Sequence, residues 1–313
     1  MKIVLLEGLG VPEKVIEAQA KKLSDMGHTF MAYEKDTDPK VQEARCRDAD
    51  VIMLANMPLA PSALAGAPEL KFIDVAFTGV DHIPMEMARE RGIAVSNASG
   101  YATRAVAELC MGFMVSLLRN VEQTGKRCRE GGTKEGLIGN LLFGKTVGIV
   151  GAGAIGKQTA ALCKAFGCRV LAFNRSRVTD PSIDEQVTLE ELLERSDIVS
   201  LHCPLTAQTR GMIGGKELAR MKKTAFLINT ARGGVVDTPA LAAALEQGKI
   251  AGAACDVFDM EPPLPADYPL LHTPHTIVTP HIAFASAESM EQRAQIVFDN
   301  LYAWLEGKQI NAV

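Results

Sequence analysis

Residues 146–156, which read TVGIVGAGAIG, decide the fold. They join an apolar run, long enough for one buried strand, to three glycines spaced G-x-G-x-x-G, and a helical pattern then continues to about Gly167. In this context the first glycine allows a tight turn, the second lets the backbone approach a pyrophosphate and the third lets the helix pack on the strand. The helix N-terminus adds N–H groups and the positive end of its dipole. The stretch therefore predicts a dinucleotide site with contacts at Gly151, Gly153, Ala154, Ile155 and Gly156.

The end of the next expected strand, 169–173, bears on which dinucleotide binds. An NAD site usually has Asp or Glu there, to bind the ribose hydroxyls, whereas this chain has Asn174, Arg175, Ser176 and Arg177. Arginines and a hydroxyl would pair with the 2′-phosphate of NADP, which a carboxylate would repel. The sequence therefore favours NADP(H), with contacts at Asn174, Arg175 and Ser176. NAD(H) remains the alternative if both arginines are solvated surface residues.

Short apolar runs alternate with helical patterns along the whole chain. This alternation is typical of βαβ units with parallel sheets. Two separate series of such units predict an α/β protein with two doubly wound parallel-sheet domains. The expected strands are 2–6, 51–54, 72–75, 93–95, 146–150, 169–173, 198–201, 225–229, 250–254 and 276–278. The expected helices include 13–26, 103–119 and 286–305, one with a capping box at Thr188 and Glu191, and one with Thr238 as N-cap and Pro239 in the first turn.

Composition argues against several classes of protein. The net charge is −4 with no long Lys/Arg cluster, which argues against a nucleic-acid partner. No apolar stretch approaches the roughly 18 residues of a membrane span, and the first apolar run is too short for a signal peptide. The seven cysteines include no C-x-x-C and no Cys/His cluster at metal-ligand spacing. We expect buried reduced thiols, no metal and a cytoplasmic protein.

Three further segments carry reactive side chains just past expected strands. Arg232 lies in residues 229–237, Glu261 in residues 256–263 and His281 in residues 279–283. Open α/β sheets bind ligands at the carboxyl ends of their strands. We therefore expect an Arg, a Glu and a His to converge on the nicotinamide.

Together with the glycine turn, and with residues 77–82 (FTGVDH), these segments resemble the signature segments of the D-2-hydroxyacid dehydrogenase family. They run from about Thr78 to Ala283 in the family's order and spacing. The resemblance implies a Rossmann-like cofactor domain, residues 100–283, inserted into a smaller flavodoxin-like substrate domain built from residues 1–99 and 284–313. The active site would lie in the cleft between them. A homodimer is also implied, and the expected helix 103–119, which is apolar on more than one face, favours it as well.

The chemistry implied by this resemblance suits the three side chains. Arg232 offers an always charged fork for the carboxylate and carbonyl of a 2-oxo acid. His281 carries an imidazole, the usual proton donor of enzymes near neutral pH, and can donate a proton to the developing alkoxide. Glu261 would hold the imidazole ring and favour its protonated form. The implied reaction is hydride transfer between NAD(P)H and a small 2-oxo acid such as glyoxylate or hydroxypyruvate, giving the D-2-hydroxy acid.

The family's other positions fall on further residues of this chain. Backbone N–H groups of Thr78 and Gly79 would complete the binding of the substrate carboxylate, and Asp256 would orient the nicotinamide carboxamide. Met57, on the loop after strand 51–54, is a candidate for contacting the substrate side chain. Further cofactor contacts are expected at Thr103, Cys203, Pro204, Thr209, Thr230 and Ala231. Phe284 stands where many members carry Trp, and the remaining histidines, His82 and His202 among them, are interpreted as structural or surface residues.

Two alternatives stay open. One is an NAD-linked dehydrogenase of another 2-hydroxy acid, such as phosphoglycerate or lactate. The other is a dinucleotide-sensing interaction protein, which could keep the Arg, Glu and His set. Turnover distinguishes the second alternative, because an interaction protein would bind cofactor without oxidising it.

Overall fold

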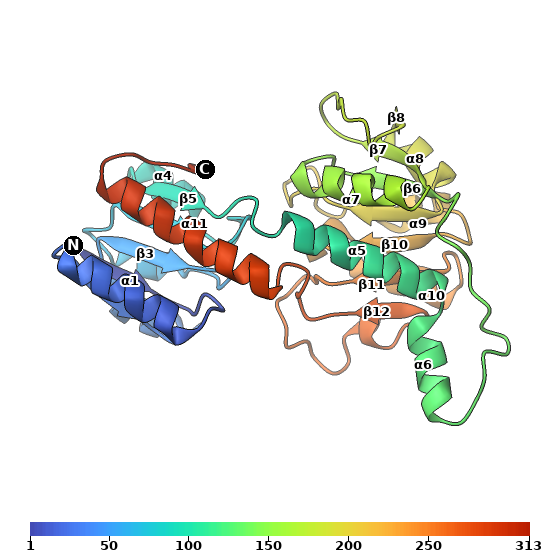
Figure 1. Cartoon of the computed structure of the whole chain (residues 1–313), viewed down its shortest axis with the longest axis horizontal. Coiled ribbons are helices and arrows are strands. Elements are labelled where there is room, and N and C mark those ends of the chain that lie inside the picture. Colours follow the sequence, from blue (N-terminus) through green and yellow to red (C-terminus); the bar gives the residue numbers. More distant parts are fainter. The chain divides into compact units, whose positions relative to one another are not determined.

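The computed structural model describes all residues, 1–313, and the chain forms two compact units. The first unit comprises Met1–Ala102 and Ala285–Val313, and the second comprises Thr103–Phe284. Both chain termini therefore lie in the first unit, as Figure 1 shows. The assignment of substrate binding to the first unit remains a prediction.

The first unit is built around a five-stranded parallel sheet with the strand order β2-β1-β3-β4-β5. This flavodoxin-like order confirms the predicted fold class for this part of the chain. The order reverses between β1 and β3, which is where doubly wound sheets bind ligands. The elements are β1 (Lys2–Leu5), α1 (Glu13–Asp25), β2 (Thr29–Ala32), α2 (Pro39–Cys46), β3 (Val51–Leu54), α3 (Pro61–Ala65), β4 (Phe72–Val75), α4 (Met85–Glu90), β5 (Ala94–Asn97) and α11 (Ala287–Leu305).

Two helices far apart in the sequence, α1 and α11, pack side by side in this unit (Figure 1). The hydroxyl of Tyr302 donates to Gln19 Oε1 at 2.6 Å, and the Lys22 ammonium lies 3.6 Å from the centre of the Tyr302 ring. The end of the chain is thereby held against its beginning.

A buried carboxyl group on β4 also contacts α11. Asp74 is fully buried, and its Oδ1 accepts a hydrogen bond from Asn300 Nδ2 at 2.9 Å, while its Oδ2 has no partner. Burial raises the pKa of Asp74 well above its ordinary value. This carboxyl group is therefore protonated over a wider pH range in the folded chain than in the unfolded chain.

The second unit has a seven-stranded parallel sheet with the order β12-β11-β10-β9-β6-β7-β8. Here the order reverses between β6 and β9. The elements are α5 (Thr103–Leu118), α6 (Val121–Arg129), β6 (Thr146–Val150), α7 (Ala154–Ala165), β7 (Arg169–Phe173), β8 (Glu185–Gln186), α8 (Leu189–Arg195), β9 (Ile198–Leu201), α9 (Gly215–Arg220), β10 (Phe226–Asn229), the 3-10 turn η1 (Gly233–Val235), α10 (Thr238–Glu246), β11 (Gly252–Cys255), η2 (Pro269–Leu271), β12 (Thr276–Val278).

The predicted helix 103–119 is confirmed as α5, which packs within this unit against α7, β10 and β11 (Figure 1). Eight of its side chains are buried, on more than one face. Because the same chain covers much of this apolar surface, the helix is weaker support for a second subunit than its sequence suggested.

One predicted helix start is wrong by a residue. The capping box of Thr188 with Glu191 is present at α8, but α10 is capped by Asp237, not by Thr238. The Asp237 carboxylate accepts the Ala240 N–H at 3.0 Å, which leaves Thr238 in the first turn of the helix. A carboxylate is at least as good a cap as a hydroxyl, and it stands one residue earlier.

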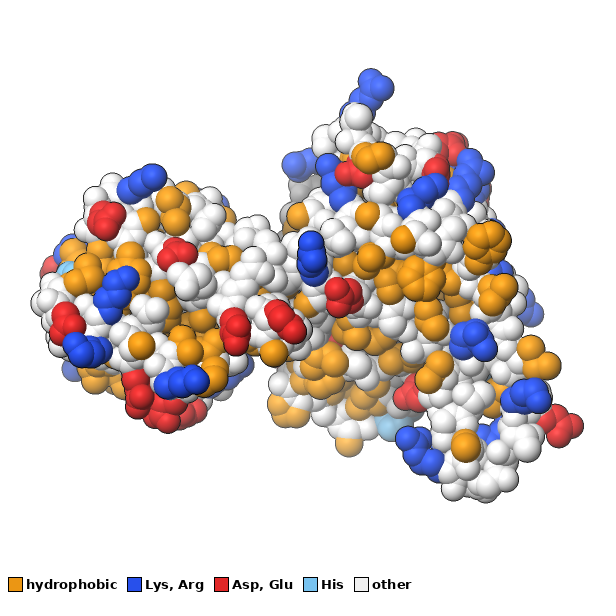
Figure 2. All heavy atoms as spheres, viewed as in Figure 1, with side chains coloured by type: hydrophobic (Ala, Val, Ile, Leu, Met, Phe, Trp, Pro, Cys, Tyr) orange, Lys and Arg blue, Asp and Glu red, His pale blue; other side chains and the backbone are white.

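The surface of the second unit carries exposed hydrophobic side chains along α6 and the segment after it. Hydrophobic groups are visible along this edge in Figure 2, among charged groups of both signs. The large exposed members are Val121, Ile138, Leu141 and Phe143. None of the helices is both long enough and apolar enough to cross a membrane.

Candidate active site

The glycine turn lies where the order of the second sheet reverses, between β6 and β9. Gly151 has a φ of +96°, and a Cβ there would lie 2.8 Å from the backbone N of Cys203, just past β9. A Cβ on Gly156 would lie 2.1 Å from the carbonyl oxygen of Gly151. Both positions therefore require glycine, for the tight turn and for the close packing of α7 on β6.

The second glycine of the turn meets a different environment. A Cβ on Gly153 would have no atom of the chain within 4 Å, so the backbone is open on this side. Gly153 is the N-cap of α7 and provides no side-chain cap for the first N–H groups of that helix. An open backbone beside uncapped N–H groups fits the pyrophosphate of a dinucleotide. Ala154 and Ile155, in the first turn of α7, lie beside the same opening.

The loop after β7 is ordered by hydrogen bonds of its own. Asn174 Oδ1 accepts from the N–H of Ala152 at 3.2 Å, which ties this loop to the glycine turn. Asn174 Nδ2 donates to the carbonyl and hydroxyl oxygens of Ser176, both at 3.1 Å. Gln186 Nε2 donates to the backbone carbonyls of residues 174 and 176. Arg175 and Ser176 are exposed on this loop, and Arg175 forms no ion pair within the chain. The loop thus presents a cation and a hydroxyl beside the glycine turn.

Arg232 is held by a residue that the sequence analysis did not single out, Asn229. This Asn ends β10 and is 1% exposed. Its Nδ2 donates to the carbonyl oxygen of Arg232 at 3.0 Å, and its Oδ1 accepts from the N–H of Ala231 at 3.1 Å. An Asn that bonds the backbone two and three residues ahead fixes a turn, and its place at a strand end was the available signal.

The segment after Arg232 touches the segment after β11. A Cβ on Gly233 would lie 1.8 Å from the backbone carbonyl carbon of Phe258. Only glycine allows this approach, and it brings the Arg232 turn against the strand end that leads to Glu261.

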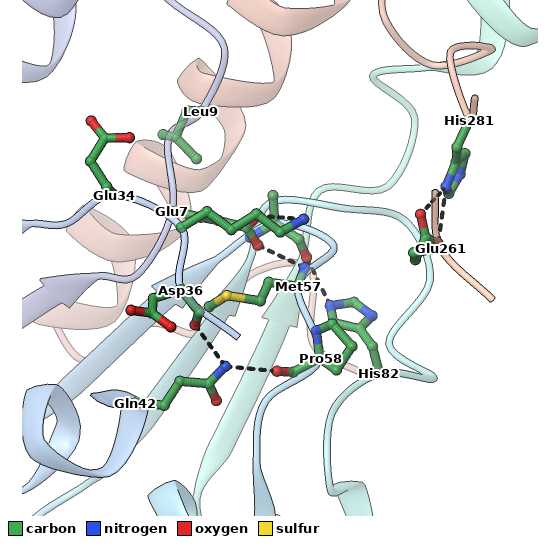
Figure 3. Close-up of polar contacts among 12 residues, drawn as sticks. Glu7, Leu9, Glu34, Asp36, Gln42, Met57, Pro58, His82, Glu261 and His281 are labelled. Atoms are coloured by element: carbon green, nitrogen blue, oxygen red, sulfur yellow. Dashed lines mark hydrogen bonds and ion pairs between the residues drawn. The ribbon is translucent and has the colours of Figure 1, made fainter. Parts of the chain in front are cut away.

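Glu261 and His281 form the predicted pair. His281 Nδ1 lies 3.1 and 3.0 Å from the two carboxylate oxygens of Glu261, and Figure 3 shows the two side chains facing each other. The imidazole side chain is 11% exposed and the carboxylate 48%. The Phe284 ring meets the imidazole edge-on, with centroids 5.2 Å apart. With Nδ1 directed at the carboxylate, Nε2 is the atom that can give a proton to a ligand.

The turn that carries His281 is held by Asp256. His281 has a φ of +57°, and its backbone N–H donates to the Asp256 carbonyl oxygen at 2.9 Å. The Asp256 carboxylate accepts from the Thr279 hydroxyl at 2.5 Å and from the N–H groups of Ile282 and Ala283, both at 2.8 Å. Asp256 has no exposed surface. The structure therefore gives Asp256 a positioning role for the His281 turn, while its predicted contact with the nicotinamide stays a prediction.

The other predicted cofactor positions fall after strand ends, at a helix start or in the turn between β9 and α9 of the second unit. Thr230 follows β10, and its hydroxyl lies 3.2 Å from Cys110 Sγ. The Thr209 hydroxyl donates to the carbonyl oxygen of Pro204 at 2.6 Å and so closes the loop that begins at Cys203. Thr103 is the first residue of α5. Burial lowers the pKa of His202 to about 4, so this neighbour of the glycine turn is neutral at pH 7.

The predicted substrate residues of the first unit lie past β3 and β4. Asn97 Nδ2 donates to the carbonyl oxygen of Thr78 at 2.7 Å, which steadies the segment that continues to Gly79. Met57 is fully buried. Its backbone N–H donates to Glu7 Oε1 at 2.8 Å.

A glycine turn at the reversal of a parallel sheet, beside an Arg turn and a carboxylate–imidazole pair at the same strand ends, defines a nicotinamide-dinucleotide oxidoreductase. The family model of the D-isomer specific 2-hydroxyacid dehydrogenase NAD-binding domain matches residues 111–283. The chain belongs to this family and is an NAD(P)-dependent 2-hydroxyacid dehydrogenase.

Relatives and solved structures agree over nearly the whole chain. The chain is 40% identical to the glyoxylate reductase of Korarchaeum cryptofilum over 310 residues, which cover 95% of this chain and 92% of that protein. It is 39% identical to the glycerate dehydrogenase of Methylorubrum extorquens over 296 residues, covering 91% and 92%. The solved structure of a glyoxylate reductase from Paecilomyes thermophila matches with a TM-score of 0.90 at 30% identity, covering 100% and 98%.

Proposed function

We propose that this protein uses NADPH to reduce a small 2-oxo acid, of the glyoxylate or hydroxypyruvate kind, to the D-2-hydroxy acid. The observation that carries the proposal is the bidentate contact of Glu261 with His281 Nδ1, at 3.0 and 3.1 Å. The names of the two relatives, a glyoxylate reductase and a glycerate dehydrogenase, support the same substrate class.

The proposed roles follow from the chemistry of each side chain. The bound nicotinamide supplies the hydride. Arg232 binds the substrate carboxylate and polarises the carbonyl through its permanently charged guanidinium group. His281 gives the Nε2 proton to the alkoxide oxygen as it forms, and Glu261 holds the imidazole ring in the orientation that exposes Nε2. Backbone N–H groups of Thr78 and Gly79 bind the substrate carboxylate.

The preference for NADPH is proposed from the loop after β7. Arg175 and Ser176 are exposed beside the glycine turn, and residues 174–177, which directly follow β7, include no carboxylate that would repel a 2′-phosphate. Asn174, Arg175 and Ser176 bind the adenosine ribose and its phosphate in this proposal.

We also propose a homodimer, formed through the hydrophobic edge of the second unit. Val121, Ile138, Leu141 and Phe143 are each at least half exposed there. Large exposed hydrophobic side chains that gather along one edge are typical of protein interfaces. Sedimentation analysis checks this, and a monomeric mass at micromolar concentration would contradict it.

The proposed reaction is tested by the loss of NADPH absorbance, and separately of NADH absorbance, with glyoxylate, hydroxypyruvate, pyruvate and a branched 2-oxo acid. We expect rapid NADPH oxidation with glyoxylate and with hydroxypyruvate, and slower oxidation of NADH with the same acids. Tight NADPH binding without turnover on any acid would favour the dinucleotide-sensing interaction protein. Faster turnover with NADH would favour the NAD-linked alternative.

A further inference from the structure

A buried carboxylate, Glu7, bridges the position where the first sheet reverses its strand order. Glu7 comes just after β1, and residues 55–60 come just after β3, which pairs with β1. The Glu7 side chain is 5% exposed. Its Oε1 accepts from the N–H groups of Ala55 and Met57, both at 2.8 Å (Figure 3). One side chain therefore links the two segments at the position where doubly wound sheets bind their ligands.

Two further side chains hold the same loop, residues 55–60. His82 Nε2 lies 2.8 Å from the Ala55 carbonyl oxygen. Gln42 Nε2 donates to the Pro58 carbonyl oxygen at 3.1 Å, and Gln42 Oε1 accepts from the N–H of Ala60 at 2.9 Å. Figure 3 shows Glu7, Gln42 and His82 reaching the loop from different segments of the unit. The loop is thus fixed by side chains and has no regular secondary structure of its own.

The bonds of Glu7 are of a kind that determines backbone position. Glu7 accepts two backbone N–H groups through one oxygen, so it fixes the loop at two points. Its burial is unfavourable unless both oxygens are compensated. Lys35 Nζ, 3.8 Å from Glu7 Oε2, is a half-exposed and weak partner. The two N–H groups, two residues apart, are therefore the main compensation, and they fix the peptide groups that precede Ala55 and Met57.

The loop held in this way lies at the same sheet edge as the proposed substrate contacts. Thr78 and Gly79 follow β4, the strand next to β3. In the proposed function Thr78 and Gly79 bind the substrate carboxylate, so the loop on the neighbouring strand is the segment placed to line the rest of the substrate.

We propose that Glu7 is a positioning residue for substrate recognition: it fixes residues 55–59 as a pocket wall and thereby sets the KM for the 2-oxo acid. Glu7 contacts the loop backbone and takes no part in proton or hydride transfer. The inference rests on the proposed function, because it assumes that a 2-oxo acid binds at this edge.

Two substitutions separate the reach of Glu7 from its charge. Glu7→Gln keeps the length of the side chain and an oxygen that can accept both N–H groups, but it loses the charge. Glu7→Asp keeps the charge but is one methylene shorter, so it cannot reach both N–H groups. We expect Glu7→Asp to raise the KM for glyoxylate by about tenfold to 100-fold, with kcat changed by less than about threefold. We expect Glu7→Gln to stay within about threefold of wild type in both constants.

Amide hydrogen exchange tests whether Glu7 holds the loop backbone, without relying on enzyme activity. In the wild-type protein the amides of Ala55 and Met57 should exchange slowly, whereas that of Asn56, for which the structure has no acceptor, should exchange quickly. Glu7→Asp should accelerate exchange at Ala55 or Met57 by about tenfold or more, and Lys35→Ala, the control, should leave both unchanged.

Each result decides a different point. Rapid exchange of the Ala55 and Met57 amides in the wild type would contradict the claim that Glu7 holds this loop. This result can be obtained even if the variants fail to fold. Unchanged KM in a folded Glu7→Asp, or an equal rise in KM in Glu7→Gln, would overturn the positioning role. Absence of turnover by the wild type with any 2-oxo acid would instead contradict the proposed function, and the exchange data would still stand.

Discussion

Replacing Asp256 by Asn should release the turn that carries His281. The wild-type carboxylate accepts three hydrogen bonds from this turn, two through Oδ1 and one through Oδ2. In Asn one of the two oxygens becomes an NH₂ group, which cannot accept. At least one N–H or O–H of the turn therefore loses its acceptor in a fully buried place.

The magnitude follows from the bond that is lost and the backbone it restrains. A hydrogen bond to a charged acceptor stabilises by about 1.5–3 kcal/mol. His281 has a φ of +57°, and a left-handed backbone costs a non-glycine residue about 1–2 kcal/mol. The lost bond is therefore comparable to the energy that keeps His281 in this conformation. Because 1.4 kcal/mol corresponds to tenfold, the productive position of His281, and with it kcat, should fall by about tenfold to 100-fold.

Steady-state kcat and the Kd of NADPH should be measured together. We expect the Kd of NADPH to change by less than about threefold in Asp256→Asn, because the structure shows the carboxylate occupied by the turn. The control is Asp259→Asn, the same change on a neighbouring exposed carboxylate that accepts from the Tyr268 hydroxyl. A wild-type kcat in Asp256→Asn would refute the positioning role, and a weaker Kd with normal kcat would point to the nicotinamide contact instead.

Three further outcomes are expected from the same structure. Arg175→Ala should raise the Kd of NADPH by about tenfold to 100-fold through the loss of a charge-assisted bond and leave that of NADH unchanged, measured by calorimetry; an equal effect on both would contradict the NADPH preference. Asp74→Asn should remove a pH dependence of the free energy of unfolding. Because the pKa of Asp74 is raised in the folded chain, its contribution to this free energy is fully present below the ordinary pKa of 3.8. The contribution is lost as the pH rises, by about 1.4 kcal/mol per pH unit, until the folded-state pKa is reached. The urea midpoint of wild type should therefore fall relative to that of the variant between pH 5 and 8, and parallel curves would contradict this. Gly233→Ala should lower kcat by more than about tenfold, because its Cβ would meet the Phe258 backbone at 1.8 Å, and an unchanged kcat would contradict the need for this approach.

The alternation of apolar runs was enough to predict most strands of both sheets, and those of β3, β4, β6, β7, β9 and β12 agree with the structure at both ends. Strands that are buried on both faces read as continuous apolar runs, so their pattern is strong. β2, at the edge of the first sheet, was not predicted. Its burial pattern shows mostly exposed residues, and such a strand takes its conformation from pairing with β1, which no local pattern reveals.

The reactive side chains were easier to predict from sequence than the residues that hold them. Glu261 and His281 stand at strand ends in recognisable segments, and the structure pairs them. The positioning role of Asp256 depends on a turn some 26 residues later in the chain, which sequence spacing cannot specify. The bonds of Glu7 to the loop after β3 likewise join residues 48 and 50 positions apart. Such contacts are fixed by the neighbouring parallel strands, so they emerge only when the sheet order is known.

The most direct test of the central claim is a single turnover of the preformed enzyme–NADPH complex with glyoxylate, in wild type and in His281→Ala. We expect His281→Ala to bind NADPH normally and to oxidise it about 10²- to 10⁴-fold more slowly, because the alkoxide no longer receives a proton from the imidazole. Equal rates of NADPH oxidation in the two proteins would contradict the assignment of His281, held by Glu261, as the proton donor.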